Sequence, residues 1–157
     1  MPREPIDEGA LLNAAFVAAL VSSAAKSHEQ ATGNPLAWPL VFVVPPLVVF
    51  SDVRERLPKR VTAHLAKWVT ANPLIRLENG HRTAAMTTYT MRAIRFGARH
   101  GLLELTEGRL RGTVTDSAAA NAFAGEAAEI LRAASFVGKL LARDDASQVY
   151  ALLGVRP

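Results

Sequence analysis

The predicted fold depends most on the pattern of residues 87–113, TTYTMRAIRFGARHGLLELTEGRLRGT. Its first half repeats apolar residues at helical spacing, which predicts a helix that Thr87 or Thr88 caps and that Gly101 ends. Apolar and polar residues then alternate on both sides of Glu107–Gly108, which predicts two short strands joined by a tight turn. A helix followed at once by a hairpin is the order found in winged helix-turn-helix proteins.

The residues before this stretch predict further helices. Apolar residues recur at helical spacing between residues 60 and 70, and Asn72–Pro73 ends that run and starts another helix to about Ala85. Asn79–Gly80 is a possible interruption of the second helix. The residues expected on its inner face are Leu74, Ile75, Leu77 and Ala84. Residues 60–113 are therefore interpreted as a winged-helix-like segment.

The N-terminal third predicts one amphipathic helix and one buried segment. Residues 8–29 form a helical pattern rich in Ala and Ser, and two explanations stay open: tight packing inside the domain, or contact with a partner helix. Residues 36–50 are apolar on every side, which indicates burial. Because Pro45–Pro46 cannot both lie inside a regular helix, we expect a short helix that begins there, or a kink.

The C-terminal helices are expected within residues 117–153. Asp116 or Ser117 is predicted to cap a long alanine-rich helix to about Ala142, and residues 146–153 form a last short helix before Gly154. The chain is thus predicted to be mainly α, a helical domain that carries a winged-helix-like helix and β-hairpin.

Composition sets further limits. The chain has 157 residues, of which 50% are hydrophobic and 20% charged, so we expect one folded domain over residues 1–157. It has no Cys and no secretory signal pattern, so a cytoplasmic location is expected. Its longest apolar run is about 12 residues, shorter than the roughly 20 that a membrane helix needs, so no membrane association is expected. The net charge of +4 permits nucleic acid or acidic protein as a partner and selects neither.

The sequence offers few groups for catalysis. The four histidines have no second ligand at metal-binding spacing, and no glycine-rich phosphate loop or Gly-x-Ser-x-Gly motif is present. Asp144–Asp145 is better explained as a helix cap than as a cation site, because a bare pair lacks the other oxygen ligands. We therefore predict no enzymatic activity, no cofactor and no metal.

The remaining candidate site is basic. Arg92, Arg95 and Arg99 fall on one side of the helix before the hairpin, and the hairpin adds Arg109 and Arg111. In a winged helix these two elements reach DNA. The alternatives are an ordinary solvated face and a contact with an acidic protein surface.

Six blocks of the sequence, taken in order, resemble the middle components of bacterial three-component ABC ATPase systems, which include the accessory subunit of Lamassu-type antiphage defence. The blocks are Pro39–Phe50, Arg54–Pro58, Leu65–Val69 with Asn72–Pro73, Ala93–Leu103, Phe136–Lys139 and Leu152–Pro157. The resemblance implies an SMC-like ABC ATPase and an effector, often a nuclease, as partners, with double-stranded DNA reached through the complex. The alanine-rich N-terminal helix departs from the family pattern.

Three functional hypotheses follow. The first is a non-catalytic accessory subunit that binds the ATPase and helps couple DNA or ATP state to the effector. The second is a free-standing winged-helix transcriptional regulator. The third, a small hydrolase, is the weakest because no nucleophile–base pair is apparent.

Overall fold

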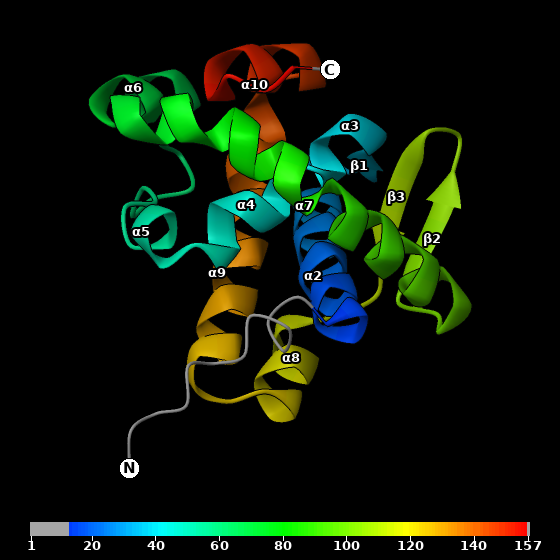
Figure 1. Ribbon diagram of the computed structural model, residues 1–157. Helices are drawn as coiled ribbons and strands as arrows, with labels where there is room; N and C mark the ends of the chain where they lie inside the picture. The colour runs from blue at the N-terminus through cyan, green and yellow to red at the C-terminus, as the bar shows by residue number, and fades with distance from the viewer. Residues whose placement is uncertain (1–12, 157) are drawn as a thin grey trace.

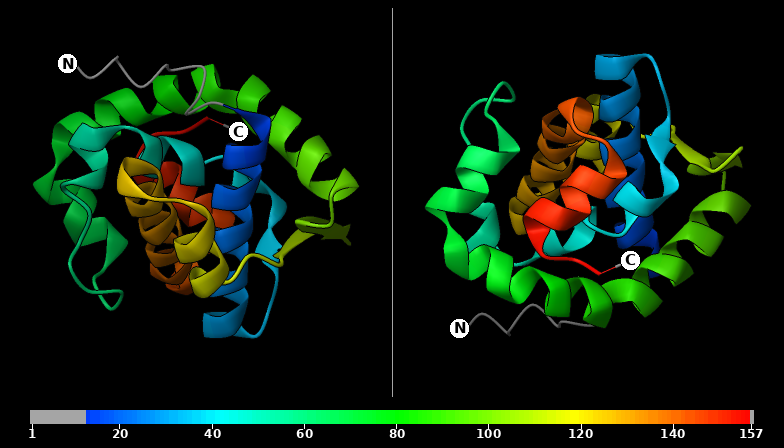
Figure 2. Two further views of the ribbon diagram at one scale, coloured as in Figure 1. Left: turned by 90° about the horizontal axis from the view of Figure 1, so that it is seen from below. Right: turned by 90° about the horizontal axis from the view of Figure 1, so that it is seen from above.

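The chain folds into a mainly helical structure with a small antiparallel sheet, as the sequence predicts. The computed structural model describes residues 13–156. Helix α2 (Ala14–Thr32) runs through the middle and packs against α9 (Gly125–Leu140) and α7 (Pro73–Arg99) (Figure 1). Figure 2 shows α7 along one side of the molecule, with the hairpin near one of its ends and α6 (Leu65–Ala71) near the other. No helix of the described residues is long and apolar enough to cross a membrane.

The small residues of α2 serve packing inside the structure. Asn13 caps the helix, and every residue from Phe16 to Ala25 is buried. The Ser27 hydroxyl donates to the Ser135 carbonyl of α9 at 2.5 Å, and Gly138 lies directly against the Ala24 backbone. The partner-helix explanation is therefore wrong for these residues. The predicted helix start near residue 8 lies outside the described residues.

The apolar segment 36–50 is largely buried, as predicted. It divides into β1 (Leu36–Ala37), α3 (Trp38–Val41) and α4 (Val44–Val49), and α5 (Ser51–Arg54) follows. Pro45 and Pro46 occupy the first turn of α4, where a missing N–H costs no hydrogen bond, so the expected short helix is confirmed.

Helix α7 corrects two predictions. The two helices expected between residues 73 and 100 are one continuous helix, and the Thr87 hydroxyl donates to the Thr83 carbonyl within it at 3.0 Å instead of capping a new helix. Gly80 does not interrupt α7. Its backbone lies so close to the C-terminal turn that a Cβ atom at position 80 would come within 2.5 Å of the Gly154 carbonyl oxygen. Of the inner-face residues expected in its first half, only Ile75 is buried, and Leu74, Leu77 and Ala84 are exposed.

The predicted hairpin is confirmed and gains a third strand. Strands β2 (Leu103–Thr106) and β3 (Arg109–Gly112) join at Glu107 and Gly108, whose positive φ angles of 52° and 74° suit a tight hairpin turn. The sheet order is β1-β3-β2, all antiparallel. The winged-helix arrangement of residues 60–113 is not confirmed, since the helix–turn–helix expected before the hairpin is a single long helix from Pro73 onward.

Ser22 of α2 ties the hairpin to the helical core. Its hydroxyl donates to the Leu102 carbonyl at 2.7 Å and accepts from the backbone N–H groups of Thr113 and Val114 at 2.9 and 3.0 Å. One side chain thus satisfies three backbone groups at the two ends of the hairpin. The hairpin is therefore fixed relative to α2 and to the end of α7.

The prediction of a single long C-terminal helix is also wrong. The structure has two helices there, α8 (Asp116–Ala122) and α9, followed by the short η1 (Leu141–Arg143). Thr115, rather than Asp116 or Ser117, caps α8. Between the helices, Phe123 packs edge-on against Phe16 with ring centroids 5.6 Å apart, and Gly125 has a φ of 63° that turns the chain. The last helix, α10 (Ala146–Leu153), begins at an Asp145 capping box and ends at Gly154, as predicted.

Candidate functional site

The three arginines of α7 form an exposed basic face. Arg92, Arg95 and Arg99 are exposed, and none of them forms an ion pair among the described residues. Their spacing of three and four residues places the three guanidinium groups along one side of the last turns of α7. The helix carries no carboxylate between Arg82 and Arg99, so nothing on α7 itself offsets their charge. We call Arg92, Arg95 and Arg99 the basic face.

The two hairpin arginines are held within the protein instead. Arg109 donates to the Pro35 carbonyl at 2.8 Å, which fastens β3 to the chain before β1. Arg111 pairs with the Glu29 carboxylate of α2 at 3.1 Å. Because both side chains already bind groups of this chain, they are less available to a ligand than the basic face. The glutamate that engages Arg111 lies 82 positions away in the sequence.

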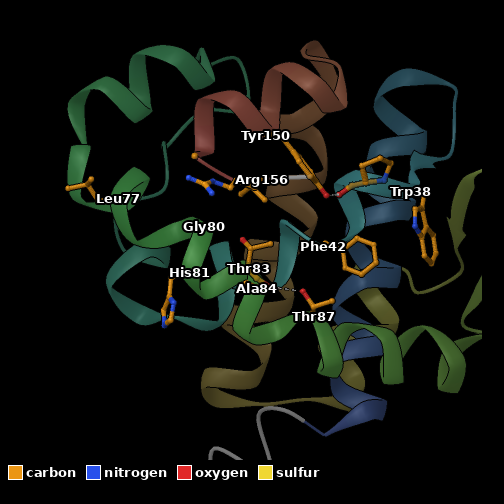
Figure 3. Close-up of a pocket in the computed structure, with 13 residues that line it drawn as sticks. Trp38, Phe42, Leu77, Gly80, His81, Thr83, Ala84, Thr87, Tyr150 and Arg156 are labelled. Carbon is orange, nitrogen blue, oxygen red and sulfur yellow. Dashed lines mark hydrogen bonds between the residues drawn. The ribbon is translucent and has the colours of Figure 1, made fainter.

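A second feature, not anticipated from the sequence, is an open cleft of about 680 Å³ between α3, α7 and α10. Trp38 and Phe42 lie at one end and Leu77 at the other, with Tyr150 above α7 (Figure 3). The signal for it in the sequence is the apolar Leu77, whose helical spacing predicts an inner face but which lines the cleft instead.

The cleft has a fixed wall. The Tyr150 hydroxyl of α10 donates to the Pro39 carbonyl at 2.6 Å, and Trp38 and Phe42 pack edge-on with ring centroids 5.4 Å apart. Burial raises the pKa of the Tyr150 hydroxyl, so it stays protonated and continues to donate at neutral pH. The approach of Gly80 to Gly154 brings α7 close to the C-terminal turn on the other side.

None of the four histidines belongs to a metal-binding cluster of the described residues. Among the described residues, no group of three or more His, Cys, Asp or Glu side chains is placed to hold a metal ion. His64, His81 and His100 are exposed, and only His28 is buried. Its Nδ1 donates to the Gly138 carbonyl at 2.9 Å, which assigns the proton to that nitrogen because a carbonyl only accepts.

His28 gives the fold an expected pH dependence. Burial lowers its pKa, and the nearby Arg109 charge lowers it further, against the opposing effect of the Gly138 hydrogen bond. The unfolded chain therefore takes up a proton below about pH 6.5 that the folded chain does not, so the contribution of His28 to stability is full above that pH and declines as the pH falls. For one proton the slope cannot exceed about 1.4 kcal/mol per pH unit.

This decline is expected to be smaller in His28→Gln, which cannot titrate. The measurement is urea unfolding of both proteins at intervals from pH 7.5 to 5. His81→Gln, at an exposed position on α7, is the matched control and should follow the wild type. Equal slopes for the wild type and His28→Gln would contradict the assignment.

Comparison with known proteins gives one match. A family model described as "ABC-three component (ABC-3C) system Middle Component 3" matches residues 4–157. No curated protein and no solved structure matches. The matched range contains the whole α7 helix, the hairpin and the cleft. Since the match covers nearly the entire chain, this protein belongs to the family of middle component 3 of ABC-three component systems.

Proposed function

We propose that this chain is a non-catalytic accessory subunit of a Lamassu-type antiphage system. In this role it binds an SMC-like ABC ATPase and helps couple the DNA or ATP state of that ATPase to a nuclease-like effector. The observation that carries the proposal is the family match over residues 4–157, because a middle component implies an ATPase and a further component as partners. The described residues also lack a metal-binding cluster, which fits a subunit that leaves the chemistry to its partners.

The basic face is the proposed contact for DNA phosphates or for an acidic partner surface. Exposed guanidinium groups that form no ion pair with the described part of the chain keep their charge for a ligand, and the helix fixes their spacing. A subunit that reports on bound DNA needs backbone contacts that are independent of sequence, and those are electrostatic. We expect weak DNA binding by the chain alone and stronger binding once the ATPase is present.

The test is co-expression of the chain with the ATPase and effector of the same three-component system. We expect a complex that survives affinity purification and gel filtration. The isolated chain should show no ATP hydrolysis and no metal-dependent DNA cleavage. A monodisperse chain that ignores the ATPase at micromolar concentration, or turnover that a point substitution in this chain removes, would contradict the proposal.

The regulator hypothesis is tested on the same material. A transcriptional regulator needs base contacts worth about 1–3 kcal/mol for each bidentate pair, which salt weakens little. Nanomolar, salt-resistant binding of the isolated chain to one DNA sequence would therefore favour a regulator over the accessory subunit.

A further inference from the structure

The first half of α7 borders two depressions that meet at one residue. Leu77 lines both the cleft described above and a second hollow of about 510 Å³ between α6, α7 and α10. The second hollow is lined by Ala66, Val69, Thr70, Pro73, Arg76, Leu77, Ala151 and Leu152. We call the two hollows together the α7–α10 groove. Between Pro73 and Thr87 it extends about 20 Å along α7, at 1.5 Å per residue.

The groove is apolar where a free surface would normally be polar. Leu77, which lines both hollows, is 74% exposed. Trp38, Phe42 and Tyr150 add partly exposed aromatic surface at the other end. Exposed apolar side chains gathered around one groove are typical of an interaction site, because their exposure to water is unfavourable.

The charges around the groove have one sign. Arg156 lines the cleft, and Arg76, whose guanidinium donates to the Ala151 carbonyl at 3.4 Å, lines the second hollow. No Asp or Glu is among the described residues that line either one. Glu78, the single acidic residue of α7, is exposed but pairs with Arg82 at 2.9 Å. The groove is therefore complementary to an apolar ligand that carries negative charge along its edges.

One buried polar group in the cleft lacks a partner. Thr83 is 5% exposed and lines the cleft, and its Oγ1 has no hydrogen-bond partner among the described residues. A buried hydroxyl without a partner is unfavourable, and a polar atom of a bound ligand can satisfy it. The unpartnered Thr83 hydroxyl is a separate observation from the exposed apolar side chains, and both indicate a ligand in the same cleft.

The groove favours a helix over an extended peptide. Its main walls come from α3, α6, α7 and α10, whose backbone groups are largely used in their own helical hydrogen bonds, so they offer no strand edge to an extended chain. A ligand that enters an apolar groove must satisfy its own backbone groups, and a helix does so internally. A length of about 20 Å accommodates roughly 13 helical residues.

We propose that the α7–α10 groove binds an acidic amphipathic helix of the ATPase. The apolar side of that helix packs on Leu77 and the aromatic residues, while its carboxylates face Arg76 and Arg156. This inference rests on the proposed function, which supplies the partners, and adds the surface and the kind of segment that it receives.

The test compares two leucines in the co-expressed complex. Leu77→Asp places a negative charge at the centre of the groove, and Leu105→Asp makes the same change at a 47% exposed position on the hairpin. Both variants should melt close to the wild type, because exposed substitutions rarely change stability by more than about 0.5 kcal/mol. We expect Leu77→Asp to reduce recovery with the affinity-tagged ATPase at least tenfold, and Leu105→Asp to leave it unchanged.

A photo-crosslinking amino acid in place of Leu77 identifies the bound segment. We expect a cross-link to the ATPase, in a peptide with apolar residues at three- and four-residue spacing and acidic residues between them. Wild-type recovery of Leu77→Asp, or a cross-link only to the effector, to DNA or to a second copy of this chain, would overturn the groove proposal and leave the proposed function standing. Failure of the wild-type chain to co-purify would overturn both.

Discussion

Replacing Gly138 with valine is expected to reduce the free energy of unfolding by about 3 kcal/mol or more. Gly138 of α9 lies directly against the Ala24 backbone of α2, so a Cβ atom there would overlap the Ala24 carbonyl. A backbone atom in a helix cannot rotate aside as a flexible side chain can, so α2 and α9 must separate. Separation also weakens the hydrogen bonds from His28 to Gly138 and from Ser27 to Ser135, each worth about 1 kcal/mol.

For a chain of this size, 3 kcal/mol corresponds to a melting temperature lower by about 6–12 °C. Circular dichroism melts and urea unfolding measure both quantities. Arg132→Val is the matched control, since it places the same β-branched residue at an exposed position of α9. If Gly138→Val loses no more stability than Arg132→Val, the close contact between α2 and α9 is not a determinant of stability.

Reversing all three charges of the basic face, in R92E/R95E/R99E, is expected to weaken DNA binding by the assembled complex about 100-fold or more. Each substitution removes an attraction and adds a repulsion, and within residues 13–156 the three arginines form no ion pair whose loss would disturb the fold. If each arginine contacts one phosphate, the slope of log K against log salt should become shallower by about 2.7. Fluorescence anisotropy at several salt concentrations measures both effects.

The control for net charge is K59E/R60E/R132E, which reverses three exposed cations elsewhere on the chain. It should retain most of the affinity, since its residues lie outside the basic face. Equal losses in both triple variants would indicate an effect of total charge and contradict a localised site. Loss of ATPase co-purification in R92E/R95E/R99E with unchanged DNA affinity would assign the basic face to the protein partner.

The elements whose boundaries are marked by neighbouring residues in the chain could be predicted from the sequence alone. Pro45 and Pro46 placed the start of α4, and the Asp145 cap with Gly154 bounded α10. Glu107–Gly108 located the hairpin turn, because few residues tolerate the positive φ angles that the turn requires. Helical spacing also placed Arg92, Arg95 and Arg99 on one face, since three- and four-residue steps nearly complete one turn.

Tertiary structure decided the features that depend on which segments meet. Asn79–Gly80 resembles a helix break, yet α7 continues through it because Gly80 permits close contact with the turn at Gly154. The alanine-rich segment predicted as one helix divides into α8 and α9 around Phe123, which packs on Phe16 of α2.

The candidate sites also depend on contacts between distant segments, which the sequence does not show. Apolar spacing shows that Leu74 and Leu77 share a region of α7 but not whether that region faces the core, and the structure leaves both exposed. From the sequence alone, the arginines of β3 could not be distinguished from those of α7 as ligand contacts. The structure distinguishes them, because Arg111 pairs with Glu29 of α2. Periodicity along the chain fixes which residues share a face, whereas the packing of distant segments fixes what that face contacts.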